Sequence, residues 1–378
     1  MKYLRDLTKE DLIGKRVLLR ADFNVPMKDG EVVGDFRILK TLPTIEFLRD
    51  MGARIVIASH VGGENGKSLA PVSTYLSKYT DIVFAPDMRS PETRHVVDTM
   101  LDGDAVLFEN LRNDPGEKGN SKQFAEFLAS FADIYVNDAF AVSHREHASI
   151  VGVPTLLPSY AGLLMEEEIK MLTKVLNPPH PLLFILGGAK FDTKLPLLKK
   201  FLKIADYIFI GGALAHNVLQ KRGFQVGKST ISDGVFDMTD LVMSDKVFVP
   251  TEVVTMNGDE ISVKRMDQMF TDEKIVDAGE GTLANIKVLL DKSAFVLWNG
   301  PLGFYEGGFD DGTHKLAQMI SEAKADSLVG GGDTLTSIHK MGVEEGFENI
   351  STGGGAMLDF LVNETLPGIE ALQASCAR

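Results

Sequence analysis

The sequence predicts an α/β protein of two domains, each built on a parallel sheet. The chain has 378 residues, more than one hydrophobic core usually organises. Short runs rich in apolar and β-branched residues alternate with amphipathic stretches along its whole length. Parallel strands are buried by helices on both faces of their sheet, and that arrangement produces this alternation.

Each half of the chain carries five predicted strands. In the first half they are 16–20, 54–58, 82–84, 105–108 and 134–136. In the second half they are 182–186, 207–210, 247–249, 295–297 and 327–329.

A single predicted helix, 161–176, lies between the two sets of strands. It has acidic residues near its start, lysines later and Pro178-Pro179 beyond its end, which is the usual order of helix signals. We interpret this helix as the connection between the domains. The domains are then expected at 1–160 and 161–363.

The composition narrows the class of protein. Apolar residues make up 44% and charged residues 24%, as in globular proteins, and the net charge of −14 argues against nucleic-acid or acidic-membrane partners. The only cysteine, Cys376, rules out an intrachain disulfide and cysteine-based metal sites. With no bilayer-length apolar run and no signal-peptide pattern after Met1, a cytoplasmic enzyme is expected.

Polar or glycine-rich groups follow most of the predicted strands. Ligands of open α/β sheets bind beyond the carboxyl ends of the strands, so these groups are expected to face ligands. In the first half they are Asp22 to Pro26 with Arg37, Ser59 to Gly63, Glu109 to Arg112, and Asn137-Asp138 with His144 to His147. In the second half they are Gly187 to Lys190 with Lys194, Gly211 to Ala213, Asn299 to Pro301, and Gly330 to Thr334.

The last of these groups, Gly330 to Thr334, is the most informative. Glycines let the backbone turn sharply and bring N–H groups against a ligand, and a helix start adds further unpaired donors. Asp333 could hold a hard cation such as Mg²⁺ through its oxygens. The combination favours a nucleotide-phosphate site; the alternative is an ordinary turn in which Asp333 caps the helix.

The two halves differ in the residues that bind anions. Ten of the thirteen arginines fall at or before Arg145, whereas 25 of the 36 glycines follow residue 160. Arginine side chains suit carboxylates and phosphates, and glycine loops bind nucleotide phosphates through the backbone. We therefore expect a small anion in the first half and a nucleotide in the second.

Other motifs point elsewhere but are weaker. Gly279 to Ala284 matches the dinucleotide pattern G-x-G-x-x-A, yet Glu280 would direct an acid at a pyrophosphate. His60, His144 and His147 lie near arginines, which favours anion contacts over a metal site. No G-x-S-x-G elbow supports serine hydrolase chemistry.

The motifs, taken in order, closely resemble those of phosphoglycerate kinase along nearly the whole chain. The matching runs are 20–26, 59–60, 109–112, 136–140, 186–190, 298–301, 330–334, 351–356 and 366–368. The resemblance implies two Rossmann-like lobes joined by a helix, with the substrate cleft between them and segment 364–378 packing back on the first lobe. It also implies a monomer that transfers a phosphoryl group reversibly between 1,3-bisphosphoglycerate and Mg-ADP, giving 3-phosphoglycerate and Mg-ATP.

The resemblance also assigns roles by position. Arg37 and Lys190 would be catalytic, because both would meet the phosphoryl group during transfer. The phosphoglycerate would lie among Asp22, Phe23, Asn24, Arg37, His60, Val61, Gly62, Gly63, Arg112 and Arg145. The nucleotide would lie among Gly188, Lys194, Gly211, Gly212, Asn299, Glu306, Gly331, Gly332, Asp333 and Thr334, with Glu306 on the ribose and Asp333 near the Mg²⁺.

Two positions depart from the family pattern. Gly63 stands where the family usually has arginine, and the acid of the usual Lys-Val-Ser-Asp-Lys run is moved by one position to Asp192. Both lysines of that run, Lys190 and Lys194, are kept. A dinucleotide oxidoreductase using Gly279 to Ala284, and a protein that binds a phosphorylated acid without chemistry, are the competing hypotheses.

Overall fold

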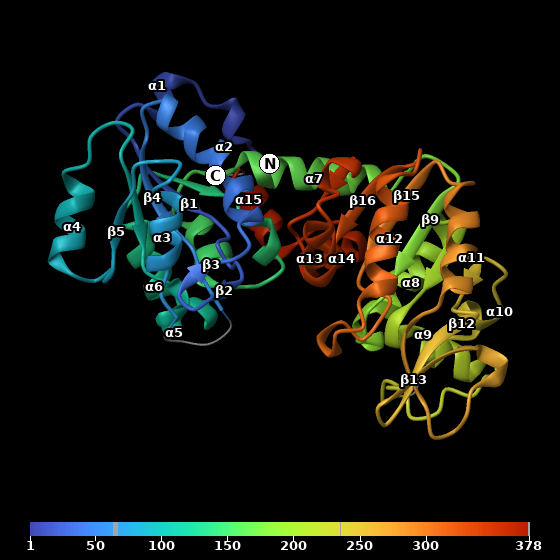
Figure 1. Cartoon of the computed structure of the whole chain (residues 1–378). Helices are drawn as coiled ribbons and strands as arrows, with labels where there is room; N and C mark the ends of the chain where they lie inside the picture. Colours follow the sequence, from blue (N-terminus) through green and yellow to red (C-terminus); the bar gives the residue numbers. More distant parts are fainter. Residues whose placement is uncertain (63–66, 235, 377–378) are drawn as a thin grey trace. The chain divides into compact units, whose positions relative to one another are not determined.

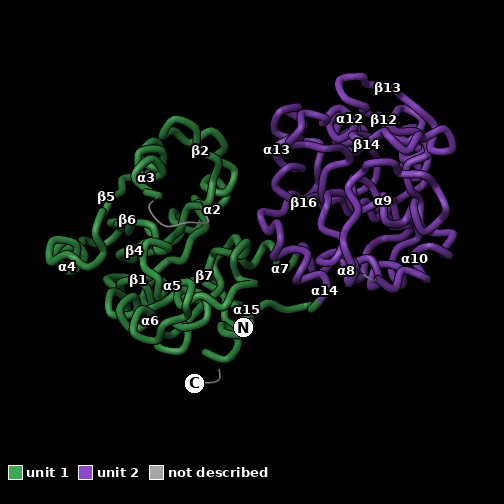
Figure 2. Tube along the Cα trace, turned by 90° about the horizontal axis from the view of Figure 1, so that it is seen from below, with its two compact units in different colours: residues 1–170, 363–378 green, residues 171–362 purple. Residues whose placement is uncertain are grey.

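The computed structural model describes residues 1–62, 67–234 and 236–376 (Figure 1). The chain divides into unit 1, Met1–Lys170 with Asn363–Arg378, and unit 2, Met171–Val362 (Figure 2). The domain boundaries expected from the sequence, after residues 160 and 363, stay a prediction.

Unit 1 is built on a six-stranded parallel sheet. Its strand order is β5-β6-β4-β1-β7-β8. The strands are β1 (Arg16–Arg20), β4 (Arg54–Ala58), β5 (Val83–Ala85), β6 (Ala105–Phe108), β7 (Ile134–Asn137) and β8 (Ser159–Ala161). The chain reverses its direction of winding between β1 and β7, which makes the ends of these two strands the expected ligand side of the sheet.

Both faces of this sheet are buried, and successive residues of a strand supply opposite faces. In β1, Val17 and Leu19 join the core formed with the helices α2 (Phe36–Asp50) and α3 (Ala70–Leu76). The other face carries Phe108, whose ring lies 4.9 Å from that of Phe131, after α6 (Lys122–Ala129). Burial on both faces explains why these strands read as continuous apolar runs.

The remaining elements of unit 1 are short. They are α1 (Lys9–Leu12), the hairpin β2 (Met27–Lys28) and β3 (Glu31–Val32), α4 (Pro91–Asp98), α5 (Pro115–Lys118) and α15 (Pro367–Ser375). The C-terminal helix α15 belongs to unit 1 through contacts that include a hydrogen bond from the Gly368 amide to the Ser143 carbonyl, at 2.8 Å.

Unit 2 is built on a second six-stranded parallel sheet, of order β11-β10-β9-β15-β16-β17. Numbered along the chain, this is the order 3-2-1-4-5-6 of dinucleotide-binding folds. The strands are β9 (Leu182–Leu186), β10 (Tyr207–Ile210), β11 (Val247–Phe248), β15 (Phe295–Asn299), β16 (Asp326–Gly330) and β17 (Asn349–Ile350). The predicted α/β class with parallel sheets is confirmed, and its switch point lies between β9 and β15.

The helices of unit 2 lie on the two faces of this sheet. Ile185 and Trp298 point into a core with α11 (Glu280–Leu290), α12 (Asp311–Ser321) and α13 (Gly332–Met341). On the other face, the ring of Phe184 lies 4.5 Å from that of Phe201 of α8 (Phe191–Ile204). The further helices are α9 (Gly212–Lys221), α10 (Thr239–Met243) and α14 (Gly355–Asn363).

A three-stranded antiparallel sheet, of order β13-β12-β14, interrupts unit 2 between β11 and β15. Its strands are β12 (Glu252–Asn257), β13 (Glu260–Arg265) and β14 (Lys274–Ala278). The sequence analysis missed this sheet. Strand β13 is exposed along most of its length, so it lacks the apolar run by which the parallel strands were recognised.

The connecting helix α7 (Leu163–Val175) takes its N-terminal cap from another element of unit 1. Asp138, directly after β7, is fully buried, and its Oδ1 accepts a hydrogen bond from the Met165 amide at 3.1 Å. Its other oxygen, Oδ2, accepts no hydrogen bond from the described residues. Burial raises the pKa of Asp138 to about 6, and hydrogen bonds from Thr44 and from the start of α7 oppose that rise only in part.

We expect Asp138 to make the stability of unit 1 depend on pH. A carboxyl group whose pKa is higher in the folded state stabilises the fold below its unfolded pKa, near 4, and this contribution is lost as the pH rises through about 6. The free energy of unfolding of the wild type, minus that of Asp138→Asn, should therefore fall by about 2–3 kcal/mol between pH 4 and pH 7. Calorimetric unfolding measures it. Asp81→Asn, at an exposed carboxylate, is the control, and equal pH profiles for wild type and Asp138→Asn would contradict the assignment.

Candidate active site

The loop after β1 forms the centre of a polar site in unit 1. Asp22 is buried there, and its Oδ1 accepts the Asn24 amide at 3.0 Å. The Phe23 amide donates to Ser59 Oγ at 2.9 Å, which ties the loop to the end of β4. The Phe23 ring is fully buried, so this residue anchors the loop from the core and offers a ligand only its backbone.

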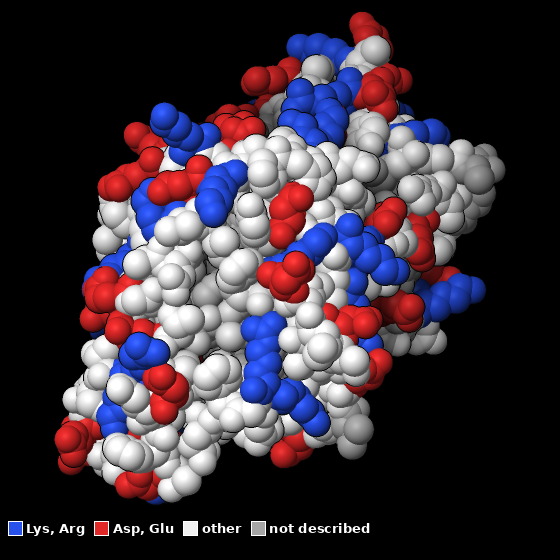
Figure 3. Space-filling model, turned by 90° about the vertical axis from the view of Figure 1, so that its right-hand side faces the viewer, with Lys and Arg blue, Asp and Glu red and all other residues white. Residues whose placement is uncertain are grey.

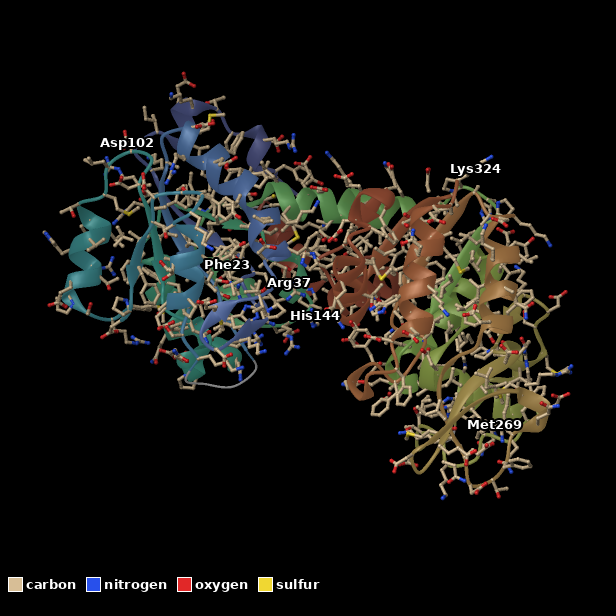
Figure 4. All side chains as sticks on the ribbon, in the orientation of Figure 1. Phe23, Arg37, Asp102, His144, Met269 and Lys324 are labelled. Atoms are coloured by element: carbon tan, nitrogen blue, oxygen red, sulfur yellow. The ribbon has the colours of Figure 1, made fainter. Side chains whose placement is uncertain are left out.

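Arg37, in the first turn of α2, reaches back to this loop (Figure 4). Its Nη1 donates to the Asn24 carbonyl at 2.8 Å and lies 3.6 Å from Asp22 Oδ2. The guanidinium is about one quarter exposed. The two contacts fix its position while part of the planar group stays accessible to an anion.

The segment His60 to Gly62 is held against the same loop. Asn110 binds the amide and the carbonyl of Val61, at 3.3 and 2.9 Å. The Gly62 amide donates to Asn24 Oδ1 at 2.9 Å, and Arg112 donates to the Gly62 carbonyl. Residues predicted from three separate strand ends are therefore joined by direct hydrogen bonds.

Positive charge dominates the electrostatics of this cluster. Burial holds the pKa of His60 well below its usual value; Asp22 opposes the shift, and Arg20, Arg112 and Arg37 add to it. Burial, followed by Arg145 and Arg20, lowers the pKa of Arg112. Groups that repel one another while buried favour an anion among them.

Several polar atoms of the cluster lack protein partners among the described residues. His60 Nε2, Arg112 Nε and Asp22 Oδ2 are buried and take part in no hydrogen bond there. Burial would raise the pKa of Asp22, but Arg37 and His60 outweigh it, so the pKa lies below the usual value and the group is a carboxylate. Such atoms are the ones a polar ligand would satisfy.

Behind the predicted residues lies a buried ion pair that the sequence analysis did not single out. Arg20 Nη2 lies 3.8 Å from Glu117 Oε1, and both side chains are almost completely buried. Glu117 also accepts both the amide and the hydroxyl of Ser149, at 3.0 and 2.6 Å. Arg20 was visible only as the last residue of a strand, and no pattern pairs it with an acid nearly a hundred positions away.

His147 lies beside this pair, and His144, labelled in Figure 4, precedes it on the same segment with Arg145. Arg145 is exposed and its Nε donates to His144 Nε2 at 3.3 Å. His147 Nδ1 lies 3.7 Å from Glu117 Oε1, and burial, followed by Arg20 and Arg112, lowers the pKa of His147 to about 4. This histidine is therefore neutral near pH 7.

Gly63, predicted to contact the substrate, lies outside the described residues. Lys67 follows the gap, and its carbonyl accepts Asn110 Nδ2 at 2.9 Å. A Cβ on Gly62 would lie 2.6 Å from Lys67 Cδ, so the lysine stem passes directly over Gly62. Lys67 is thus close to Arg112, which donates to the Gly62 carbonyl. We refer to Arg37, Arg112 and Arg145 as the arginine cluster.

In unit 2, the glycine-rich strand ends pack backbone against backbone at the switch point of the sheet. A Cβ on Gly187 would lie 2.1 Å from the Pro301 carbonyl oxygen, and one on Gly212 would lie 2.7 Å from the Gly188 amide nitrogen. No side chain larger than hydrogen fits at either position. A Cβ on Gly211, before Gly212, would lie 2.6 Å from Cδ2 of the Leu302 side chain.

These loops border a cavity of about 280 Å³. Among the predicted nucleotide-binding residues, Gly188, Gly212, Glu306 and Asp333 line it. Its other walls are Ala189, Ala213, His216, Thr230, Lys274, Ile275, Val276, Pro301, Leu302, Gly303 and Phe304. The apolar wall comes largely from β14 and the loop after β15, and of these two the sequence analysis had not connected β14 with the site.

Asp333 lies in the first turn of α13 but its side chain does not cap the helix. Gly331, at φ +108°, precedes the helix, and no side-chain cap bond forms. Burial, followed by Glu306, raises the pKa of Asp333, while Lys194 opposes the rise. Its carboxylate accepts no hydrogen bond from the described residues, so two acids stand together with oxygen atoms available to a cation.

Further residues of unit 2 were predicted to bind the nucleotide or, in the case of Lys190, to act in catalysis. Lys194 Nζ donates to the Gly187 carbonyl at 2.6 Å, and burial lowers its pKa to about 8. Thr334 is buried and its hydroxyl accepts the Gly300 amide at 2.9 Å, while Asn299 donates to the Gly330 carbonyl at 2.9 Å. Thr334 and Asn299 therefore shape the loops. Lys190 is exposed immediately before α8.

The G-x-G-x-x-A match has a different use in the fold. Gly279 follows β14 of the antiparallel sheet, so it does not open a β-α-β unit of the parallel sheet. The Gly281 amide donates to Glu252 Oε1 at 2.8 Å, and Glu280 pairs with Lys315. An amide already bound to a carboxylate is not available to a pyrophosphate, which removes the basis of the dinucleotide hypothesis.

Comparison with known proteins gives one consistent result. The family model for phosphoglycerate kinase matches residues 5–364. A phosphoglycerate kinase of Dictyoglomus turgidum is 38% identical over 391 residues, covering 98% of this chain and 99% of that protein. Solved phosphoglycerate kinases of Coxiella burnetii and Pyrococcus horikoshii are 34% and 30% identical, with TM-scores of 0.81 and 0.87. Both cover 100% of this chain and, respectively, 99% and 100% of those chains.

The packing at Gly187 predicts a contrast between two glycines. Gly187→Ala forces a methyl group against the Pro301 carbonyl and should destabilise unit 2 by about 1–3 kcal/mol or more, a fall in Tm of at least about 2 °C. Gly332→Ala is the matched control, because nothing lies within 4 Å of its Cβ position. Differential scanning calorimetry compares them. Equal Tm values for Gly187→Ala and wild type would show that the loops are not packed as described.

Proposed function

The chain belongs to the phosphoglycerate kinase family, and on that premise we propose which of its residues bind each substrate and which act in the transfer. The reaction is the reversible transfer of a phosphoryl group from 1,3-bisphosphoglycerate to ADP, giving 3-phosphoglycerate and ATP. Unit 1 binds the phosphoglycerate, and unit 2 binds the nucleotide. The observation that carries this division is the difference between the two sites, since one is an arginine cluster and the other a cavity behind glycine loops.

The arginine cluster of unit 1 suits a small acid with several negative oxygens. Arg37, Arg112 and Arg145 bind the phosphate and carboxylate groups as charge-assisted donors, and His60 adds the neutral donor or acceptor Nε2. Asp22 is the one carboxylate that faces this cluster without a hydrogen bond on Oδ2, so it accepts a hydroxyl group of the substrate. Asn24, Val61 and Gly62 hold the loops that carry these groups.

The cavity of unit 2 suits a nucleotide. The base lies between the apolar walls, Glu306 accepts ribose hydroxyls, and the phosphates lie at Gly331, Gly332 and the start of α13, where helix amides are unpaired. Lys194 neutralises phosphate charge. The carboxylate of Asp333 fits Mg²⁺ as its protein ligand, directly or through water.

Transfer needs positive charge and positioning and no general base, because the acceptor is already a carboxylate or an ADP oxygen. Arg37 and Lys190 stabilise the negative charge that spreads over the oxygens of the phosphoryl group. Mg²⁺, when bound with the nucleotide, neutralises further phosphate charge. The acid at Asp192 is exposed in the first turn of α8.

The partners are small molecules. On the face drawn in Figure 3, acidic and basic side chains are interspersed. The net charge of −14 argues against a nucleic-acid partner. No helix among the described residues has the length and apolarity needed to cross a bilayer. We propose a monomeric enzyme of the cytoplasm.

A coupled assay with 3-phosphoglycerate and Mg-ATP tests the function. Turnover that needs both substrates supports the kinase. Tight binding of 3-phosphoglycerate without turnover would favour a binding protein, and binding of NAD(H) without ATP-linked turnover would favour an oxidoreductase.

Lys190 should act mainly in the transition state. Lys190→Ala should lower kcat by about 10²-fold or more, with little change in the KM for ATP, because the ammonium is needed most when charge spreads over the phosphoryl oxygens. Steady-state kinetics measure both constants. Lys199→Ala, on the exposed side of the same helix, is the control, and a normal kcat for Lys190→Ala would remove this lysine from the mechanism.

Asp333 should be needed for the metal-bound form of the nucleotide. Asp333→Asn keeps the shape and removes the charge, so the Kd for Mg-ADP should rise about tenfold or more, while the Kd for metal-free ADP changes little. Isothermal calorimetry measures both, with Asp326→Asn as the control. The Kd for 3-phosphoglycerate should stay the same; a loss confined to this ligand would mean that the two sites are assigned the wrong way round.

Lys67 is the candidate to replace the arginine that is absent at Gly63. Because its stem passes over Gly62, Lys67→Ala should raise the KM for 3-phosphoglycerate, and Gly63→Arg in that background should restore it. Lys78→Ala is the control. If neither change moves the KM by more than about twofold, roughly 0.4 kcal/mol, Lys67 does not compensate.

A further inference from the structure

His216 is the one histidine in the wall of the nucleotide cavity. It lies on α9, one turn after Gly212, so both residues share the face of the helix that borders the cavity. The residue is 5% exposed and therefore forms a deep part of the wall. The family resemblance assigns it no role.

The contacts of His216 determine its tautomer. Its Nδ1 lies 2.8 Å from the carbonyl oxygen of Thr230. A carbonyl oxygen only accepts hydrogen bonds, so Nδ1 carries a proton and donates it. Burial lowers the pKa of His216; the hydrogen bond to Thr230 opposes this only in part and Lys274 adds to it, so the ring has no second proton near pH 7. The remaining nitrogen, Nε2, is then a lone-pair acceptor, and it has no hydrogen bond to the described residues.

We infer that His216 selects the 6-amino group of adenine by accepting a hydrogen bond from it through Nε2. This inference rests on the proposed binding of a nucleotide in unit 2. With the phosphates at α13 and the ribose at Glu306, the edge of a purine that lies farthest from the ribose carries the 6-substituent. In that position, the 6-substituent edge lies against the part of the cavity wall that contains His216. An adenine amino group donates to Nε2, whereas the 6-oxo group of hypoxanthine or guanine brings a second acceptor against it and leaves both unpaired.

Calorimetric titration with Mg-ADP and Mg-IDP tests this inference without relying on turnover. Wild-type protein should bind Mg-ADP about tenfold more tightly than Mg-IDP, the scale expected when buried acceptors face each other. His216→Phe should bring the two Kd values within about twofold. His216→Asn, whose amide can turn to donate or accept, should do the same and covers the case in which phenylalanine does not fit. His95→Phe, at an exposed histidine of α4, should keep the tenfold preference.

Nitrogen-15 spectra of the histidine rings supply an independent readout. The inference requires His216 to be protonated at Nδ1 and unprotonated at Nε2 at pH 7, and its Nε2 signal to shift when Mg-ADP binds.

Each outcome has a distinct meaning. A proton on Nε2, equal affinities in the wild type, or a preference for Mg-IDP would overturn the inference, and the last would point to a donor such as Lys274 in the same wall. If neither nucleotide binds, the proposed nucleotide site fails and the inference falls with it. If both bind equally and the coupled assay shows turnover, the proposed function stands and only the role of His216 is lost.

Discussion

Two buried carboxylates, Glu117 and Asp22, hold together arginines that would otherwise repel one another. Glu117 lies beside Arg20 and His147, and Asp22 lies beside Arg37 and His60. Each carboxylate also accepts hydrogen bonds from the backbone, at Ser149 and Asn24. An isolated buried charge is very costly, so these pairs must be kept intact for the strand ends of unit 1 to meet. The arginines remain only partly neutralised, and this incomplete balance favours the binding of an anion.

In unit 2, the described strand ends are held together by close backbone packing and not by buried ion pairs of the kind seen in unit 1. Its strand ends approach so closely that Gly187 and Gly212 have no room for a Cβ. The loops are shaped by short hydrogen bonds such as that from Gly300 to Thr334 and that from Asn299 to the Gly330 carbonyl. Charged side chains accompany these loops: Lys274, Glu306 and Asp333 line the cavity, and Lys194 donates to the Gly187 carbonyl. A rigid backbone binds phosphates with little loss of conformational freedom, which suits a ligand that the enzyme must release again.

The sequence predicted the features that depend on local pattern. All ten expected strands lie within one or two residues of observed ones, because burial on both faces makes them apolar runs. The polar residues after β1, β4 and β6 could be predicted to meet, since parallel strands place their carboxyl ends on one edge. Asp333 as an N-cap was one of two alternatives and is wrong, because Gly331 turns the chain instead.

Features that depend on distant contacts were not predicted. The pairing of Arg20 with Glu117 joins residues on different elements, and no spacing rule links them. The antiparallel sheet was missed because β12 and β13 are partly exposed and so lack a continuous apolar run. Consequently the wall that β14 gives to the cavity was missed as well, together with His216 in the same cavity. The family resemblance implied which residues would bind phosphate and ribose, but it gave no information on this wall.

The origin of that wall has an evolutionary consequence. The phosphate loops belong to the parallel sheet, where the close packing at Gly187 tolerates almost no substitution. Ile275 and Val276 belong to an excursion of the chain between β11 and β15, whose outer strand is largely exposed. Mutations can therefore accumulate in the excursion without disturbing the close-packed glycine loops. The part of the cavity wall that β14 supplies is free to change in a lineage while these loops stay fixed, whereas His216, on α9 directly after Gly212, stays tied to the loops.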